Sequence, residues 1–327
     1  MTQTPPGEVR SAVPVGRFAP STTGLSHPGT LLAALLCWLD VRASGGHFGL
    51  RLEDLDPERC RPEFADAMRR DMDWLGLDWD SEVLQSDGTR AHEEALDALA
   101  EQGRLYPCRC SRSELRAQAE RAPDGSFRYP GTCRERPLPS ASQGGWRSSD
   151  EPLRVRLSEG RIDWKSEESQ APVSEVPRDV YGDPVVRRRD GATAYHLASM
   201  VDDARAGVTR VVRGSDLAPS TSVQLALGEL LGFPRAAYRH HLLLLERQGQ
   251  KMAKFHRAVA TDVLRSSYDG ASMCGFLAHA CELTEGPRPL SPRELLKEFT
   301  WTRVRFTDRV LDWDGQALSL PAADGRH

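Results

Sequence analysis

The segment from Val15 to Asp56 constrains the fold more than any other, because its pattern is that of a strand, a loop, a helix and a second strand. Turn-forming residues follow the first apolar run. The helix has a proline in its first turn, where a missing N–H costs nothing, and it is then apolar on every face, which indicates burial. We predict one βαβ unit of an α/β fold, with its successive elements at residues 15–18, 19–24, 27–39 and 48–52.

The loop of this unit is a candidate anion site. In a βαβ unit the loop and the helix N-terminus lie at the carboxyl end of the first strand, where free amides and the helix dipole suit a phosphate. A plain βαβ unit, in which glycine and serine only turn the chain, has the same local pattern. No Gly-x-Gly-x-x-Gly fingerprint occurs in the segment, which argues against a dinucleotide-dependent dehydrogenase.

Three words of sequence carry a resemblance to a known family. Arg-Phe-Ala-Pro-Ser-Thr-Thr-Gly-Leu-Ser-His-Pro-Gly-Thr, from Arg17 to Thr30, resembles the first signature of the class I glutamyl-tRNA synthetases, whose His-x-Gly-His or His-x-Gly-Thr helix start holds ATP. Leu-Glu-Asp-Leu-Asp at 52–56 resembles the companion acidic segment of that family, and Arg-Gly-Ser-Asp-Leu at 213–217 resembles part of the second half of its core. The resemblance covers roughly residues 13 to 256.

The lysines of the chain support the same resemblance. Only four of the 43 basic residues are lysines, and Lys251 and Lys254 stand three residues apart in Gln-Lys-Met-Ala-Lys-Phe. This word resembles the Lys-Met-Ser-Lys-Ser or Lys-Leu-Ser-Lys loop of class I synthetases. Taken alone, two lysines on a loop would be a solvated pair of charges. Ala253 stands where a serine is usual in the family, so one hydroxyl contact is missing.

Composition limits the class of protein. The chain has 327 residues, 39% of them hydrophobic, which is enough for two or more domains. With a net charge of -4 there is no global basic field, so any contact with RNA must be local. The longest apolar run, the nine residues 31–39, is too short to cross a bilayer, and the first residues do not resemble a signal peptide. We therefore expect a cytoplasmic enzyme with no membrane partner.

Cysteine spacing predicts a metal site. Seven cysteines, an odd number, do not indicate a disulfide framework, and three of them fall within 26 residues as Cys108, Cys110 and Cys133. Three thiolates suit one tetrahedral zinc ion, although reduced structural cysteines would show the same spacing. The pattern resembles that of the glutamyl-queuosine tRNA(Asp) synthetases, short paralogues that bind zinc through Cys-x-Cys and a later Tyr-x-x-x-Cys. The resemblance adds Tyr129 as the fourth ligand.

The resemblance also implies the domain organisation. It predicts a class I synthetase fold, that is, a Rossmann-like nucleotide-binding core that is interrupted by a zinc-bearing acceptor-type domain and followed by a short helical C-terminal tail. Alternating apolar residues from Leu153 onward agree with a small β-containing insert. We expect a helix at 222–231 and a strand at 241–245 that closes the sheet. The predicted parts are core residues 1–103, insert 104–180, core residues 181–256 and helical region 257–327.

The implied reaction is the activation of glutamate by ATP, followed by transfer of the glutamyl group to queuosine at the wobble position of tRNA(Asp). Full-length glutamyl-tRNA synthetases continue into a large anticodon-binding domain, and the 72 residues after Phe255 leave no room for it. We expect ATP with Mg²⁺, L-glutamate and queuosine-bearing tRNA(Asp) as partners, one structural zinc ion, and a monomer. A glutamyl-tRNA synthetase charging tRNA(Glu), a non-catalytic paralogue and a nucleotidyltransferase that shares the His-x-Gly start are the alternatives.

The same resemblance implies which residues bind ATP, which bind glutamate and which bind zinc. The phosphates of ATP and the departing pyrophosphate are assigned to His27, Gly29, Thr30, Lys251 and Lys254, of which His27, Gly29 and Lys254 bind ATP. The side-chain carboxylate of glutamate is assigned to two arginines, its ammonium group to a carboxylate, and the rest of the pocket to two hydroxyl groups: Arg17, Arg213, Glu53, Ser21 and Tyr195. The zinc ligands are Cys108, Cys110, Tyr129 and Cys133.

Overall fold

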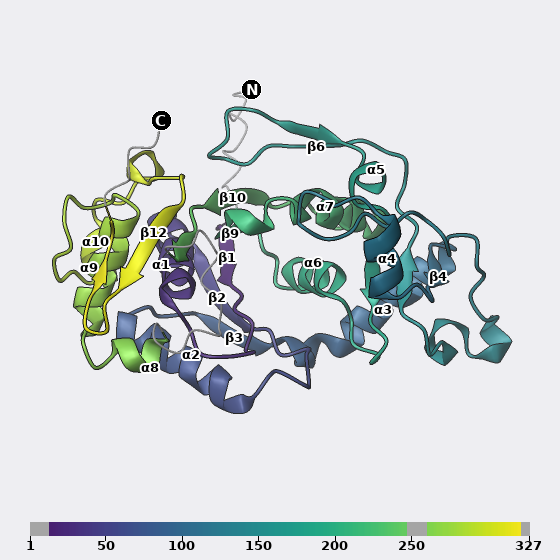
Figure 1. Ribbon diagram of the computed structural model, residues 1–327, viewed down its shortest axis with the longest axis horizontal. Helices are drawn as coiled ribbons and strands as arrows, with labels where there is room; N and C mark the ends of the chain where they lie inside the picture. Colours follow the sequence, from purple (N-terminus) through teal and green to yellow (C-terminus); the bar gives the residue numbers. More distant parts are fainter. Residues whose placement is uncertain (1–12, 247–259, 322–327) are drawn as a thin grey trace, which may run out of the picture.

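A five-stranded parallel sheet lies at the centre of the protein, with the strand order β10-β9-β1-β2-β3 (Figure 1). The computed structural model describes residues 13–246 and 260–321. The order of strands reverses between β1 and β9, which is the position where open α/β sheets bind ligands. The strands of this sheet are β1 (Val15–Phe18), β2 (His47–Leu52), β3 (Ser81–Leu84), β9 (Arg210–Gly214) and β10 (Ala237–His241).

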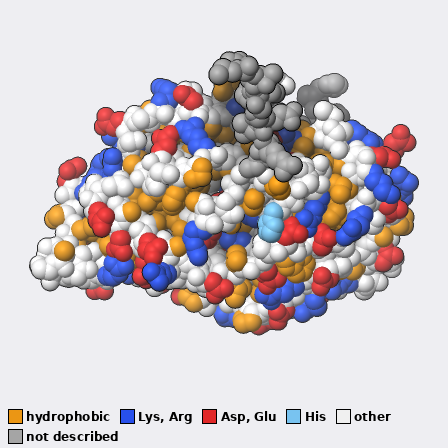
Figure 2. Space-filling model, turned by 180° about the vertical axis from the view of Figure 1, so that it is seen from behind, with side chains coloured by type: hydrophobic (Ala, Val, Ile, Leu, Met, Phe, Trp, Pro, Cys, Tyr) orange, Lys and Arg blue, Asp and Glu red, His pale blue; other side chains and the backbone are white. Residues whose placement is uncertain are grey.

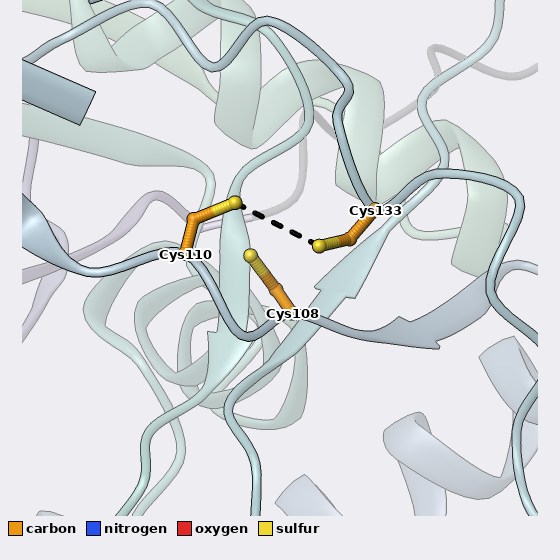
Figure 3. A group of neighbouring side chains, drawn as sticks. All are labelled: Cys108, Cys110 and Cys133. Atoms are coloured by element: carbon orange, nitrogen blue, oxygen red, sulfur yellow. Dashed lines mark hydrogen bonds between the residues drawn. The ribbon is translucent and has the colours of Figure 1, made fainter. Parts of the chain in front are cut away.

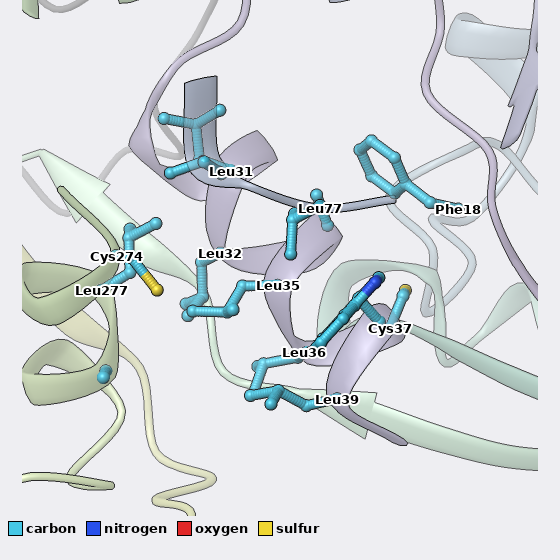
Figure 4. Packing of buried hydrophobic residues seen from close by; sticks show 14 of the residues in the cluster. Phe18, Leu31, Leu32, Leu35, Leu36, Cys37, Leu39, Leu77, Cys274 and Leu277 are labelled. Carbon is cyan, nitrogen blue, oxygen red and sulfur yellow. The ribbon is translucent and has the colours of Figure 1, made fainter. Parts of the chain in front are cut away.

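The first βαβ unit has the predicted form. Helix α1 (Pro28–Ala43) joins β1 to β2 and is buried along most of its length, as its apolar faces predict. Gly16 in β1 allows a close approach, since a Cβ atom there would lie 2.3 Å from a methyl carbon of Val41 on α1. Figure 4 shows leucines of α1 directed toward Cys274 and Leu277 of the C-terminal region. The N-terminal and C-terminal parts of the chain therefore share one core.

The other helices connect the strands and cover the sheet. Glycine ends two of them, since Gly76 and Gly232 end α2 and α7 in the left-handed conformation that glycine adopts without strain. Helices of the two core halves are α2 (Pro62–Leu75), α3 (Thr89–Glu101), α6 (Tyr195–Arg205) and α7 (Ser220–Leu231). None of the helices within 13–246 and 260–321 is long and apolar enough to span a membrane.

The predicted insert shares a hydrophobic core with the helices beside it. Leu153, Val155 and Ile162 pack in one cluster with residues of α3, α6 and α7. In Figure 1 its elements lie on the side of the sheet away from the C-terminal region. These elements are β4 (Leu105–Pro107), α4 (Arg112–Gln118), β5 (Leu153–Val155), β6 (Ile162–Trp164), β7 (Val173–Glu175) and α5 (Pro177–Tyr181), with β8 (Val185–Arg187) pairing with β5.

The C-terminal region differs from the helical tail that the sequence pattern predicts. It contains two strands as well as helices, because alternation in a short segment such as Arg309–Trp313 is hidden by its charged residues. Strand β12 pairs in parallel with β11, and this pairing places the C-terminal region against the core. Its described elements are α8 (Thr261–Leu264), α9 (Gly270–Ala280), α10 (Pro292–Leu296), β12 (Arg309–Trp313) and β13 (Leu318–Ser319), and β11 (Leu244–Glu246) belongs to the preceding core part.

Two further details of the sheet were predicted wrongly or missed. The strand that closes the sheet is β10, which ends at His241, whereas of the expected strand at 241–245 only Leu244 and Leu245 belong to β11, a strand of a separate sheet. Strand β3 was missed because three of its four residues are exposed or charged. Short 3₁₀ turns complete the described structure at 85–88, 141–143, 145–148, 215–217 and 301–303.

Candidate functional site

A cavity opens at the carboxyl ends of β1 and β9, where the strand order reverses. Its wall brings together residues that lie far apart in the sequence, from the first loop, the end of β2, the start of α6 and the end of β9. All the predicted ATP and glutamate residues of the described chain line it: Arg17, Ser21, His27, Gly29, Thr30, Glu53, Tyr195 and Arg213.

The first loop is held in register with the end of β2. The amide of Thr22 donates to the carbonyl of Glu53 at 3.0 Å, and the amide of Glu53 donates to the carbonyl of Pro20 at 2.9 Å. Ser21 and Glu53 therefore form an isolated parallel bridge beyond the ends of the two strands. This pairing places the Glu53 carboxylate and the Ser21 hydroxyl on the same cavity wall.

Helix α1 begins at the cavity. His27 is its N-cap residue in an extended conformation, and Pro28 occupies the first turn. The amide of Thr30 donates to the carbonyl of His27 at 2.8 Å. A Cβ atom on Gly29 would lie 3.0 Å from the His27 ring, so glycine leaves room for the imidazole at the helix start. The positive end of the dipole of a buried 16-residue helix thus faces the cavity.

A buried chain of charges connects Arg17 with Glu53. Asp203 on α6 accepts hydrogen bonds from Arg17 Nε at 3.0 Å and from Arg51 Nη1 at 2.5 Å. Arg51 Nη2 also donates to Glu53 at 3.2 Å. Burial acts to raise the pKa of Asp203, but the two guanidinium groups outweigh it and hold this pKa at about 2. Within the described chain the terminal nitrogens of Arg17 have no acceptor and are available to a ligand.

Arg213 is buried without an ion-pair partner in the described chain. It is only 6% exposed, and its guanidinium donates to three neutral groups. The distances are 2.7 Å to Gln224 Oε1, 2.7 Å to Thr221 Oγ1 and 3.3 Å to His240 Nε2. A guanidinium has five N–H donors, so two remain for a ligand in the cavity. Since a buried charge without a counter-charge is costly, the cavity is suited to an anion at this point.

Lys251 and Lys254 lie outside the described residues. The described residues on either side of that segment are close to the cavity. Leu244 of β11 lines it, and the amide of Thr261 in α8 donates to the carbonyl of Ser26 at 3.0 Å. Described residues on both sides of the segment that carries the two lysines therefore lie at or beside the same cavity.

The three predicted cysteine ligands form a second cluster, away from this cavity. The sulfur atoms of Cys108, Cys110 and Cys133 lie within 4.8 Å of one another, and they point toward a common centre (Figure 3). Burial acts to raise the pKa of Cys133, but hydrogen bonds from the backbone of Arg109, from Tyr129 and from Cys110 lower it to about 7. This cluster can hold a metal ion, and a set of thiols suits zinc.

Tyr129, which the family resemblance implies as the fourth ligand, lies beside the three cysteines. Its phenolic oxygen is 3.6 Å from Cys108 Sγ and accepts a hydrogen bond from the amide of Cys133 at 2.7 Å. Arg154 lies over the Tyr129 ring at 3.7 Å and donates from Nε to Cys108 Sγ at 3.3 Å. A guanidinium beside this cluster offsets the negative charge that thiolate and phenolate ligands would bring.

Several residues that hold the cavity together were missed in the sequence. The word Val-Asp-Asp at 201–203 already signalled two acidic groups in an otherwise apolar helix, which is the pattern of buried carboxylates with partners. Gln224 and Thr221 gave no such signal, because polar residues are common on helix surfaces. The missed residues are Arg51, Asp203, Thr221, Gln224 and His240.

Comparison with known proteins places this geometry in a family. Residues 13–296 match the family model "tRNA synthetases class I (E and Q), catalytic domain". A glutamyl-Q tRNA(Asp) synthetase of Symbiobacterium thermophilum is 40% identical over 304 residues, which cover 88% of this chain and 93% of the relative. The protein of the same name from Nocardia farcinica is 42% identical over 303 residues, covering 92% and 94% of the two chains.

Solved structures agree on the fold. A glutamate-tRNA synthetase of Elizabethkingia anophelis superposes with a TM-score of 0.75 at 23% identity, over 94% of this chain and 69% of that one. A glutamate tRNA ligase of Elizabethkingia meningosepticum, solved with its amino acid, gives 0.73 at 23% identity, over 90% and 66%. The chain thus spans about two thirds of these two synthetases.

Proposed function

The chain belongs to the class I glutamyl- and glutaminyl-type tRNA synthetases, and within them to the glutamyl-Q tRNA(Asp) synthetases, which are ligases; from this premise we propose that it forms glutamyl-adenylate from ATP and glutamate and transfers the glutamyl group to queuosine in tRNA(Asp). The named relatives support the acceptor, and the residues of the cavity support the amino acid. We expect the enzyme to act as a monomer in the cytoplasm.

The observation that carries the proposal is the buried guanidinium of Arg213 beside the terminal nitrogens of Arg17 in one cavity. In the described chain the terminal nitrogens of Arg17 contact no carboxylate, and Arg213 contacts only neutral groups. These two cations therefore suit the side-chain carboxylate of glutamate. Glu53 stands on the same wall, and its second oxygen has no acceptor role elsewhere in the described chain, so it suits the substrate ammonium group. The charge pattern fits an acidic amino acid better than a neutral one.

The nucleotide would lie at the start of α1. Adenylation is an in-line attack of the substrate α-carboxylate on the α-phosphate, so the protein contributes position and charge neutralisation. In our proposal His27, Gly29 and Thr30 hold the phosphates, and Lys251 and Lys254 neutralise the departing pyrophosphate. Mg²⁺ bound with ATP would supply further charge neutralisation at the phosphate oxygens. The helix dipole and the close approach at Gly29 support this arrangement.

Contact with the acceptor RNA is expected to be local. On the face shown in Figure 2, lysine and arginine side chains are interspersed with aspartate and glutamate instead of forming one basic surface. The net charge of -4 agrees with this. A small protein–RNA interface suits recognition of one modified nucleoside in a loop better than an interface that extends over a whole tRNA.

The test is a labelling experiment with the purified protein, ATP and radiolabelled glutamate. We expect label on queuosine-bearing tRNA(Asp) and none on queuosine-free tRNA(Asp) or on tRNA(Glu). Mild alkali releases an ester at either place, so digestion to nucleosides locates the label. Labelling of tRNA(Glu) at its 3′ end would instead favour the charging synthetase, and the absence of glutamate-dependent ATP–pyrophosphate exchange would favour a non-catalytic paralogue.

We also propose that Cys108, Cys110, Tyr129 and Cys133 hold one structural zinc ion. Protein purified without chelator should contain about one zinc per chain by elemental analysis, as expected for a closed tetrahedral site. Cys133→Ser should lose most of this zinc and melt at a lower temperature, because metal binding to a structural site contributes to folding. The matched control is Cys60→Ser, which removes a thiol outside the cluster. Equal zinc content in both variants would contradict the site.

A further inference from the structure

We propose that Glu168 and His240 are positioning residues for Arg213, and that through them a segment of the insert sets the affinity of the cavity for the acidic substrate. Neither residue lines the cavity. His240 contacts Arg213 directly, and Glu168 contacts His240. The inference rests on the proposed function in one respect, the identity of Arg213 as a substrate-binding residue.

Hydrogen bonds link Arg213 to Glu168 through His240 and Ser166, and in each of them the donor is on the side of Arg213. Arg213 Nε always carries a hydrogen and donates to His240 Nε2 at 3.3 Å, and Thr221 Oγ1 lies 3.3 Å from the same nitrogen; we infer that this nitrogen is unprotonated, since it can then accept from both. The proton of the neutral ring is then on Nδ1, which lies 2.9 Å from Ser166 Oγ. Ser166 Oγ in turn donates to Glu168 Oε2 at 2.5 Å. The chain runs from the guanidinium to a carboxylate, with each group donating to the next.

Charge and burial agree with this direction. His240 is 4% exposed, and its other Nδ1 neighbour is Glu168 Oε1 at 3.7 Å. Glu168 also accepts from the amide of His240 at 3.1 Å. Burial acts to raise the pKa of Glu168, but the hydrogen bonds from His240 and Ser166 outweigh it and lower this pKa to about 2. An ionised Glu168 is the nearest negative charge linked to Arg213 by hydrogen bonds in the described chain, although it is two groups away.

The segment that carries Glu168 is attached to the core independently. Ser166 forms an isolated bridge with Tyr238 of β10, and the amide of Glu167 donates to the carbonyl of Tyr238 at 2.9 Å. The Glu167 carboxylate pairs with Arg210 at 2.8 Å and with Arg239 at 2.7 Å. Glu167 anchors the segment at the surface, whereas Glu168 points inward to His240. Of these two adjacent carboxylates, Glu167 therefore attaches the segment to the core, and Glu168 orients His240.

Kinetics of glutamate-dependent ATP–pyrophosphate exchange tests the role. Glu168→Gln keeps the shape of the side chain and removes its charge, and His240→Asn removes the acceptor for Arg213 Nε. Each should raise KM for glutamate about 3- to 10-fold, the effect of one weakened hydrogen bond, with KM for ATP within about 2-fold of wild type. Glu168→Asp, which restores the carboxylate, should recover part of the loss.

The matched control is Glu167→Gln, which weakens the anchor of the same segment without touching His240. It should lower the melting temperature and leave KM for glutamate within about 2-fold of wild type. An unchanged KM for glutamate in Glu168→Gln overturns the inference. So does an equal rise for glutamate and ATP, or an equal effect of Glu167→Gln, because either would indicate a merely structural role.

A second measurement is independent of catalysis. ¹⁵N NMR of histidine-labelled wild type should show His240 as the neutral tautomer with its proton on Nδ1, assigned by loss of the signal in His240→Asn. A proton on Nε2 would overturn the inference even if exchange is normal. If wild type shows no glutamate-dependent exchange, the proposed function fails, and the tautomer and its response to Glu168→Gln still decide whether the relay to Arg213 exists.

Discussion

Replacing Arg213 with leucine should lower kcat/KM for glutamate in ATP–pyrophosphate exchange by about 10- to 150-fold, because a hydrogen bond to a charged group is worth about 1.5–3 kcal/mol. Arg213 is buried at the cavity wall, and leucine keeps the apolar stem while it removes the cation. KM for ATP should change little, since the predicted phosphate-binding residues lie on α1 and on the lysine segment.

The control for this effect is an arginine with ordinary surface partners. Arg69→Leu removes ion pairs with Asp66 and Glu82 on the outside of α2 and should leave exchange unchanged. The melting temperature of both variants shows whether the fold survives. Wild-type exchange by Arg213→Leu would refute the assignment of the glutamate pocket.

Asp203→Asn should destabilise the protein by about 3–5 kcal/mol, because it removes the charge of the carboxylate that pairs with both Arg17 and Arg51. Asparagine is nearly isosteric, so the cost comes from the lost charge: Arg17 then has no carboxylate partner in the described chain, and the adjacent buried Arg51 keeps only Glu53. Equilibrium unfolding in urea measures the change in free energy. The same variant should weaken glutamate binding, since Arg17 loses its anchor.

The loss of unfolding free energy in Asp203→Asn should become smaller as the pH falls. The pKa of Asp203 is lowered to about 2 in the folded protein, against an ordinary value of about 3.9 in an unfolded chain. A lowered carboxyl pKa stabilises the fold above the unfolded value and loses that contribution as pH falls through the folded value. The difference between wild type and Asp203→Asn should therefore be constant above about pH 5 and shrink as pH falls from about 4 to about 2.

A surface pair supplies the comparison for stability. Glu94→Gln breaks an exposed ion pair with Arg90 on α3 and should cost less than about 1 kcal/mol. If Asp203→Asn cost no more than Glu94→Gln at neutral pH, the buried network would not hold Arg17 in the way described.

The first βαβ unit shows how much of the fold could be predicted. Strand, loop and helix occur where the periodicity of residues 15–52 places them, because a run that is apolar on all faces must be buried. Strand β3 and the strands of the C-terminal region were not predicted, since short strands with charged residues look like loops. Their identity as strands depends on partners such as β2 and β11, which no local pattern reveals.

The site divides in the same way. The resemblance of short motifs to a known family selected Arg17, Glu53 and Arg213, and the cysteine spacing selected the thiol cluster, because three nearby thiolates suit one metal ion. Only the tertiary structure decided which carboxylate binds which arginine: Asp203 accepts a hydrogen bond from Arg17, although 186 positions separate the two in the sequence. Likewise Glu168, from the insert, is linked to Arg213 through His240 on a neighbouring strand. Sequence patterns record local geometry and chemistry, whereas the pairing of buried charges depends on how distant elements pack, and so it exists only in the folded chain.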